Sequence, residues 1–308
     1  MPLNRREVLG SFAGAGAAAL MPGFGLAQNT PQDRPLTRAV PSSSEALPIV
    51  GLGSWITFNV GEDPVARDER AEIMRAFFED GGRLIDSSPM YGSAQPVIGY
   101  GLEKLGYPKP LFSADKVWTS DGDEGQTQIE KSRMLWGVDR FDLLQVHNLL
   151  AWEAHLDTLH AMKKAGRLRY VGVTTSHGRR HDELEDIMTK RDLDFVQLTY
   201  NIADRSVEER LLPLAQEKGI AVIANRPFRR KELIYRFQDE KLPAWADEIG
   251  ARSWAQFLLK FVISHPAVTC AIPATTRVDH VRENLASARE PLPDVKLRRR
   301  MIAYVKSV

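Results

Sequence analysis

The feature of the sequence that most constrains the fold is a regular alternation of short apolar runs with amphipathic segments. The apolar runs begin near residues 49, 84, 111, 142, 170, 195, 221 and 269. Several of them are continuously apolar, which is typical of parallel strands that are covered by helices. The intervening segments have helical periodicity, and three of them end at a glycine, namely Gly81, Gly166 and Gly219. Glycine in these places indicates a helix that stops in a left-handed conformation.

Eight strand-and-helix units predict an α/β fold of one particular class, the (β/α)8 TIM barrel, which takes about 250 residues. A doubly wound open sheet is the alternative. It favours a GxGxxG turn after a strand, and no such turn follows any of the apolar runs. The longest interval, from 221 to 269, predicts an insertion or lid at residues 228–245. Residues 36–48 precede the first run and predict a short hairpin that closes the barrel floor.

The N-terminal residues have the pattern of an export signal and not of a fold. Arg5 and Arg6 precede an Ala- and Gly-rich stretch, and small residues near Ala27 suit cleavage. Paired arginines in this position resemble a twin-arginine signal, which implies the Tat export machinery as a partner and a periplasmic location. An uncleaved anchor is the alternative. The predicted organisation is a signal peptide at 1–27, a polar linker at 28–35 and one barrel domain at 36–308.

Composition excludes several classes of partner and site. A formal net charge of +1 argues against a nucleic-acid surface, which needs an excess of Lys and Arg. The single Cys270 excludes an intramolecular disulfide and a cysteine metal cluster. His177 and His181 have the spacing of helical metal ligands, but no third ligand is evident, so no metal is predicted. Nothing in the sequence suggests a large apolar interface, and we expect a monomer.

Four polar side chains end or follow three neighbouring apolar runs. Asp86 ends the second run, and Tyr91 lies in the loop after it. Lys116 ends the third run and His147 ends the fourth. Because the carboxyl ends of the strands meet at one mouth of a barrel, we expect these four side chains to share one pocket.

These residue types suit delivery of a proton to a carbonyl oxygen. A phenol is a poor acid at neutral pH, since its pKa is about 10, and an adjacent ammonium group is expected to lower that pKa. Asp86 would keep Lys116 charged, and His147 would orient the substrate oxygen or relay a proton. No serine or cysteine is placed beside His147 as a nucleophile, which argues against hydrolysis.

These motifs resemble the aldo-keto reductase family over nearly the whole predicted domain. The matching segments are GLGSW, IDSSPMYG, the lysine of DKVW and the histidine of LLQVHN. The resemblance implies a reductase of small carbonyl compounds in which Tyr91 is the general acid. It implies that Asp86 and Lys116 tune Tyr91 and that His147 positions the carbonyl. It also implies that a nicotinamide cofactor lies across the barrel mouth.

The same resemblance implies where the cofactor binds. Gln197 matches the position that binds the carboxamide, and Arg277 is placed for a 2′-phosphate, which favours NADP over NAD. Thr275 and Thr276 precede a helix N-terminus, which suits an anion. The remaining cofactor positions are Thr174, Thr175, Asn225, Arg226, Glu283 and Asn284.

Three further residues are candidates for substrate contact because each lies at or just past a strand end: Trp55, Trp118 and Asn148. Packing at the barrel rim is the alternative for the two tryptophans.

The sequence also departs from the family pattern. Thr175, Asn225 and Ala274 stand where the family usually has an asparagine, an aromatic residue and a lysine. The glycine-rich loop after the seventh strand is replaced by a basic one with Arg226, Arg229, Arg230 and Lys231. Its arginines are expected either to clasp the pyrophosphate or to form a solvated charged face. These departures leave open a second function, an exported nucleotide-binding sensor or regulatory barrel with little or no turnover.

Overall fold

The computed structural model describes residues 34–308, so the predicted export signal and residues 28–33 of the predicted linker lie outside the described part. Within it, eight strands form one parallel sheet in sequential order from β3 to β10. They are β3 (Leu52–Gly53), β4 (Leu84–Asp86), β5 (Phe112–Val117), β6 (Phe141–Val146), β7 (Leu168–Thr174), β8 (Phe195–Thr199), β9 (Ala221–Asn225) and β10 (Val268–Ala271). Parallel bridges Val50–Ala271 and Gly53–Ala274 join the first strand to the last. The sheet therefore closes, which confirms the predicted (β/α)8 barrel.

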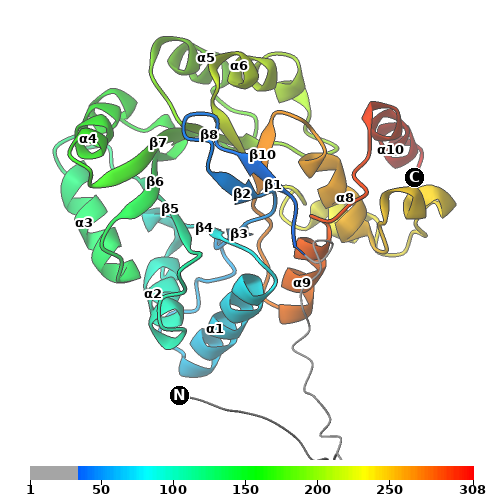
Figure 1. Ribbon diagram of the computed structural model, residues 1–308, viewed down its shortest axis with the longest axis horizontal. Helices are drawn as coiled ribbons and strands as arrows, with labels where there is room; N and C mark the ends of the chain where they lie inside the picture. The colour runs from blue at the N-terminus through cyan, green and yellow to red at the C-terminus, as the bar shows by residue number, and fades with distance from the viewer. Residues whose placement is uncertain (1–33) are drawn as a thin grey trace, which may run out of the picture.

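Helices surround the strands as a ring (Figure 1). The ring contains α1 (Pro64–Glu79), α2 (Ala94–Lys104), α3 (Gly125–Trp136), α4 (Trp152–Lys164), α5 (His181–Lys190), α6 (Leu211–Lys218), α8 (Trp254–Ile263) and α9 (Val278–Ala286). Local sequence sets their ends. Asp63 caps α1 by accepting hydrogen bonds from two backbone amides, and Gly219 ends α6 with a φ of 65°. No helix within residues 34–308 is long and apolar enough to cross a membrane.

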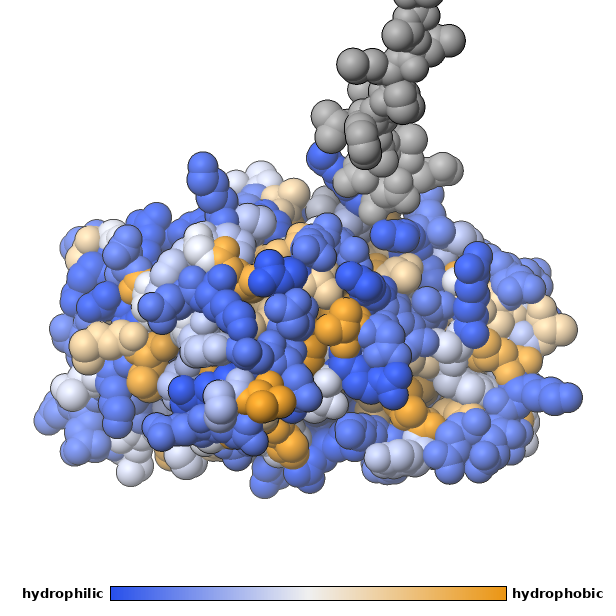
Figure 2. All heavy atoms as spheres, turned by 90° about the horizontal axis from the view of Figure 1, so that it is seen from below, coloured by the Kyte–Doolittle hydropathy of each residue, from blue (hydrophilic) through white to orange (hydrophobic). Residues whose placement is uncertain are grey.

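The predicted insertion is a separate segment between β9 and α8. It contains the short helix α7 (Glu232–Arg236) and a 3₁₀ helix at Ala244–Ile249. The last helix, α10 (Val295–Ser307), lies at the periphery of the ring (Figure 1). Figure 2 shows one face of the molecule, on which apolar residues are scattered among hydrophilic ones.

The interior of the barrel changes character along each strand. Side chains alternate between the two faces of a strand, so residues two apart point the same way. The inward positions nearer the amino ends are apolar and form a buried cluster that includes Phe112, Tyr170 and Phe195. Two residues beyond inward apolar positions come buried polar ones, such as Asp86 after Leu84. The strands themselves therefore place polar groups at the carboxyl mouth.

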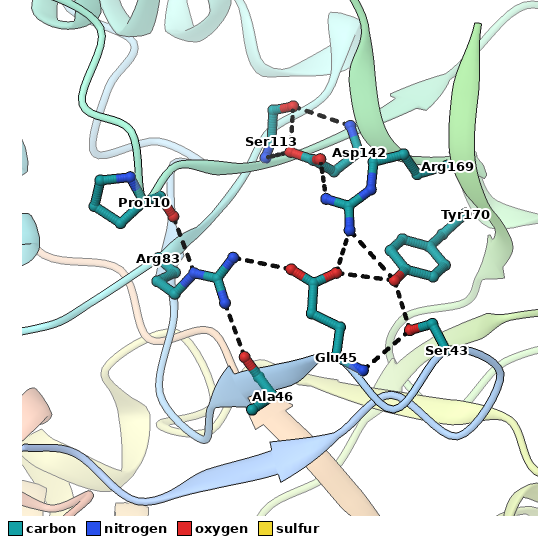
Figure 3. A network of polar contacts seen from close by, with 9 residues as sticks. All are labelled: Ser43, Glu45, Ala46, Arg83, Pro110, Ser113, Asp142, Arg169 and Tyr170. Carbon is teal, nitrogen blue, oxygen red and sulfur yellow. Dashed lines mark hydrogen bonds and ion pairs between the residues drawn. The ribbon is translucent and has the colours of Figure 1, made fainter. Parts of the chain in front are cut away.

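The floor of the barrel is closed by the predicted hairpin, which crosses the amino ends of the strands (Figure 1). Its strands β1 (Thr37–Ala39) and β2 (Ala46–Pro48) pair antiparallel. Glu45, just before β2, accepts hydrogen bonds from Arg83 at 2.9 Å and Tyr170 at 2.8 Å and pairs with Arg169 (Figure 3). The hairpin is thus anchored to the barrel by charged side chains.

Candidate active site

A pocket opens at the carboxyl ends of the strands, with a volume of about 440 Å³. Asp86, Tyr91 and His147 line it, as predicted. Lys116 lies directly behind them and is fully buried. The four residues therefore share one site, although they come from β4, β5 and the loops that follow β4 and β6.

The buried ion pair between Lys116 and Asp86 organises the back of the pocket. Lys116 Nζ donates to both carboxylate oxygens of Asp86, at 2.8 and 2.7 Å, and to the backbone oxygen of Ser87 at 2.7 Å. These three acceptors match the three protons of an ammonium group. Burial alone lowers the pKa of Lys116, but the carboxylate of Asp86 and the phenol of Tyr91 raise it above its ordinary value. Lys116 therefore stays charged in a dry environment.

Tyr91 is held by a short turn and by three neighbouring groups. It ends the 3₁₀ turn Pro89–Tyr91, which Ser88 caps by accepting from the backbone amide of Met90. Lys116 Nζ lies 5.2 Å from the centre of the Tyr91 ring. The rings of His147 and Trp55 lie 5.7 and 6.4 Å away, between centroids. The phenol thus lies beside the ammonium group and the imidazole.

The expected lowering of the Tyr91 pKa is wrong for this structure. Burial raises the pKa of Tyr91 to about 12, although Lys116 acts in the opposite direction. The reason is that the free energy needed to remove a phenolate from water exceeds the stabilisation that the nearby ammonium group gives it. Tyr91 consequently keeps its proton at neutral pH and is suited to donate it only when charge develops on a substrate oxygen.

His147 is a neutral group in this site. Burial and the charge of Lys116 hold its pKa well below the ordinary value. His147 Nδ1 lies 2.7 Å from Ser88 Oγ. The same Ser88 hydroxyl accepts a hydrogen bond from the backbone amide of Met90. Ser88 was not identified from the sequence. Its signal was present, because it lies within the same SSPMY segment that carries Tyr91.

The predicted cofactor residues on β7, β8 and β9 form a polar wall. Gln197 Nε2 donates to Asp86 Oδ1 at 2.8 Å, and Asn225 Nδ2 donates to the backbone oxygen of Thr175 at 3.0 Å. Thr174 accepts from the backbone amide of Asn148 at 3.1 Å. Thr174, Thr175, Gln197 and Asn225 all line the pocket. Within the described part of the chain, the buried hydroxyl of Thr175 has no hydrogen-bonding partner.

The other predicted positions divide into those that reach the pocket and those that do not. Trp55, Asn148, Arg226 and Thr276 line it. Four others are outside the lining: Thr275 and Arg277 directly precede α9, and Glu283 and Asn284 lie on that helix.

Trp118 is the predicted substrate residue that the structure does not bring to the pocket. It is 40% exposed and its backbone groups pair with the side chain of Gln128. Arg277 is also exposed, and its Nε donates to Asp279 Oδ1 at 2.9 Å.

A basic loop after β9 forms one rim of the pocket. Arg226, Arg230 and Lys231 line the pocket, so this part of the predicted basic loop faces the cavity. Arg226, Arg230 and Lys231 have φ values of 54°, 58° and 73°, in the left-handed region that residues other than glycine rarely adopt. Such residues cost about 1–3 kcal/mol each and cluster at functional sites. The cationic run in the sequence was the available signal.

The comparisons with known proteins decide the family. A model described as "Aldo/keto reductase family" matches residues 49–301, which is most of the chain. The chain belongs to the aldo/keto reductase family. Among residues 34–308, this family member has no group of three or more His, Cys, Asp or Glu side chains arranged to hold a metal ion.

Two curated relatives and one solved structure illustrate the similarity. Methylglyoxal reductase YeaE from Escherichia coli is 30% identical over 83% of this chain and 90% of its own. Glyoxal reductase from Bacillus subtilis is 26% identical over 77% of this chain and 82% of its own. A crystal structure of an aldo-keto reductase from Klebsiella pneumoniae in complex with NADPH has a TM-score of 0.73 at 23% identity, over 88% of this chain and 95% of that chain.

Proposed function

We propose that this family member reduces aldehydes or ketones to alcohols with NADPH. One observation carries the proposal: the phenol of Tyr91 lies in one pocket beside the buried Lys116–Asp86 pair and the neutral imidazole of His147. The reductase activities of the relatives support the substrate class.

The residues divide the work of proton delivery. A neutral His147 that accepts the Ser88 proton at Nδ1 carries its own proton on Nε2, which suits it to bind a carbonyl oxygen. Tyr91 then donates its proton to that oxygen as negative charge forms there. Lys116 stabilises the phenolate that remains, and Asp86 keeps Lys116 in place.

The polar wall suits the nicotinamide end of the cofactor. The unpartnered hydroxyl of Thr175 and the amides of Gln197 and Asn225 offer donors and acceptors for a carboxamide. Arg226, whose buried Nε has no partner within residues 34–308, suits the pyrophosphate. When bound, the reduced nicotinamide supplies a hydride. We assign the 2′-phosphate to Arg277, which would have to exchange Asp279 for it.

The test of the reductase is Tyr91→Phe, which removes only the acidic hydroxyl. We expect turnover of an aldehyde panel, followed by NADPH absorbance, to fall at least about 10³-fold, within the range of general acid catalysis. NADPH affinity, measured by fluorescence titration, should stay within about twofold, since the hydroxyl is not needed for nucleotide binding. Wild-type protein that binds NADPH and reduces nothing in the panel would favour the sensor instead.

The assignment of the 2′-phosphate has its own test. Arg277→Ala should weaken NADPH binding about tenfold or more and leave NADH binding nearly unchanged, because charged hydrogen bonds contribute about 1.5–3 kcal/mol. Equal loss for the two nucleotides would reject this role for Arg277.

We also propose that the protein is exported folded and acts as a monomer. The paired Arg5 and Arg6 support a twin-arginine route. The test is a fusion of residues 1–27 to a reporter that must fold before export. We expect periplasmic reporter signal that is lost when both arginines are changed to lysine, and an unchanged distribution would contradict the route. Size-exclusion chromatography with light scattering tests the monomer.

A further inference from the structure

The mouth of the pocket is strongly cationic. Among the described residues that line it, Asp86 is the only carboxylate, and Lys116 already neutralises it. Arg226, Arg230 and Lys231 face it without a compensating acid in the lining. An anionic group that enters this pocket therefore meets an excess of positive charge.

Arg230 is the cation whose placement is most informative. Its guanidinium carbon lies over the Trp55 ring, 4.4 Å from the ring centre, which is a cation–π contact. None of the ion pairs found in residues 34–308 includes Arg230. Its neighbour Arg229 differs, because it pairs with Asp204 at 3.2 Å and Glu232 at 3.1 Å. Arg230 thus keeps its hydrogen-bond donors available at the rim.

The two arginines of the rim serve different ends of the pocket. Arg226 donates toward His177 Nε2 at 2.6 Å, near the ends of β7 and β9 where the polar wall lies. Arg230 lies instead over Trp55, whose ring is the neighbour of Tyr91 at 6.4 Å. Arg230 is therefore on the side of the proton donor, where the substrate must bind, and not on the side of the wall.

We infer that the preferred substrates carry a carboxylate, which Arg230 binds while Tyr91 receives the carbonyl. This inference rests on the proposed reductase function and specifies its substrate class. A guanidinium fork and a carboxylate match in a bidentate geometry, and Lys231 adds a second positive charge beside it. The backbone of Arg229, Arg230 and Lys231 is left-handed throughout, which indicates that the loop is shaped to present these cations despite the conformational cost.

The experiment compares a matched pair of aldehydes, 4-carboxybenzaldehyde and its neutral methyl ester. For the wild type we expect kcat/KM to be at least about tenfold higher for the carboxylate, as a charged hydrogen-bonded pair implies. Arg230→Gln should abolish that preference mainly by raising the KM of the carboxylate, so that the two aldehydes are used with similar kcat/KM. Arg229→Gln is the control in the same loop, since Arg229 is outside the lining, and it should retain the preference. NADPH affinity should be unchanged in Arg230→Gln.

Several results would overturn the inference. Equal use of the two aldehydes by the wild type would do so and would leave the reductase function intact. An Arg230→Gln variant that loses NADPH affinity and slows both aldehydes equally would instead assign Arg230 to the cofactor. If the protein reduces neither aldehyde, a binding measurement tests the inference instead. Calorimetry of 4-carboxybenzyl alcohol and its methyl ester with the NADP⁺-loaded protein should still show the carboxylate preference, and its absence there would reject the inference.

Discussion

The two ends of the barrel are both rich in charged residues, but they use them differently. At the floor, Glu45 is shared by Arg83, Arg169 and Tyr170, so each of these groups has a partner (Figure 3). At the mouth, the hydroxyl of Thr175 has no hydrogen-bonding partner in the described part of the chain, and Arg230 takes part in none of the ion pairs found there. Polar groups that already have partners stabilise the floor, whereas polar groups without partners leave the mouth able to bind ligands.

The backbone repeats this contrast. The floor hairpin pairs in a regular antiparallel register, Thr37 with Pro48 and Ala39 with Ala46. The basic loop at the mouth instead holds Arg229, Arg230 and Lys231 at positive φ. The hairpin has one residue other than glycine at positive φ, Ser44 in its turn, whereas the loop has three in a row and accepts that conformational cost beside a cavity.

Removing the ammonium group of Lys116 is expected to have the largest effect on stability. Lys116→Met leaves the carboxylate of Asp86 buried without its cation, so the free energy of unfolding should fall by about 3–5 kcal/mol. Turnover should fall at least about 10²-fold, because the phenolate of Tyr91 is no longer stabilised. Chemical denaturation and NADPH oxidation measure the two effects.

The double variant Lys116→Met/Asp86→Leu separates these effects. It also removes the buried carboxylate that Lys116→Met leaves without a cation, so much of the lost stability should return while turnover stays as low as in the single variant. If Lys116→Met alone were as stable as the wild type, the stability of the fold would not depend on the Lys116–Asp86 ion pair.

Breaking the floor network should affect stability alone. Glu45→Gln removes the charge that Arg83 and Arg169 share, and should lower the free energy of unfolding by about 1–2 kcal/mol at neutral pH. The kcat/KM should change less than about twofold, because Glu45 is at the end of the barrel opposite to the pocket. Glu248→Gln is the matched control, since its pair with Arg300 is half exposed and should contribute little.

The pH dependence of this effect has a definite sign. Burial alone would raise the pKa of Glu45, but hydrogen bonds from Tyr170 and Arg83 and the charge of Arg169 bring it below its ordinary value of 4.5. A lowered pKa in the folded protein means stability that is present above pH 4.5 and is lost as pH falls through the folded pKa. The gap between wild type and Glu45→Gln should therefore close in acid. A constant gap would contradict the network.

The smallest expected effect is that of pH on catalysis. With the pKa of Tyr91 raised to about 12 and that of His147 far below its ordinary value, neither group changes protonation near neutrality. Burial raises the pKa of Asp115, which neighbours Lys116, to about 7, so the test applies above that titration: the kcat/KM for carbonyl reduction should vary less than about twofold between about pH 8 and about pH 10. A decline with a midpoint inside that interval would show that the phenol titrates there, and would revive the interpretation that Lys116 lowers its pKa.

Much of the fold followed from the sequence because barrel strands are local signals. The run that was predicted to start at 195 is β8, and the run at 84 is β4, since buried parallel strands are continuously apolar. Tyr91 and His147 could be placed at one mouth from strand direction alone. Trp118 could not, because the direction of its side chain depends on how the loop after β5 folds, where the Trp118 backbone pairs with the side chain of Gln128.

The order of strands and helices, the closed barrel and the end of the barrel at which the reactive residues lie all follow from the sequence. Periodicity and strand polarity are properties of the chain that need no knowledge of distant contacts. The protonation of Tyr91, the contact of Ser88 with His147 and the position of Arg230 over Trp55 could be read only from the folded structure. Burial and contacts between residues far apart in the chain set those properties, and both arise only when the barrel has closed.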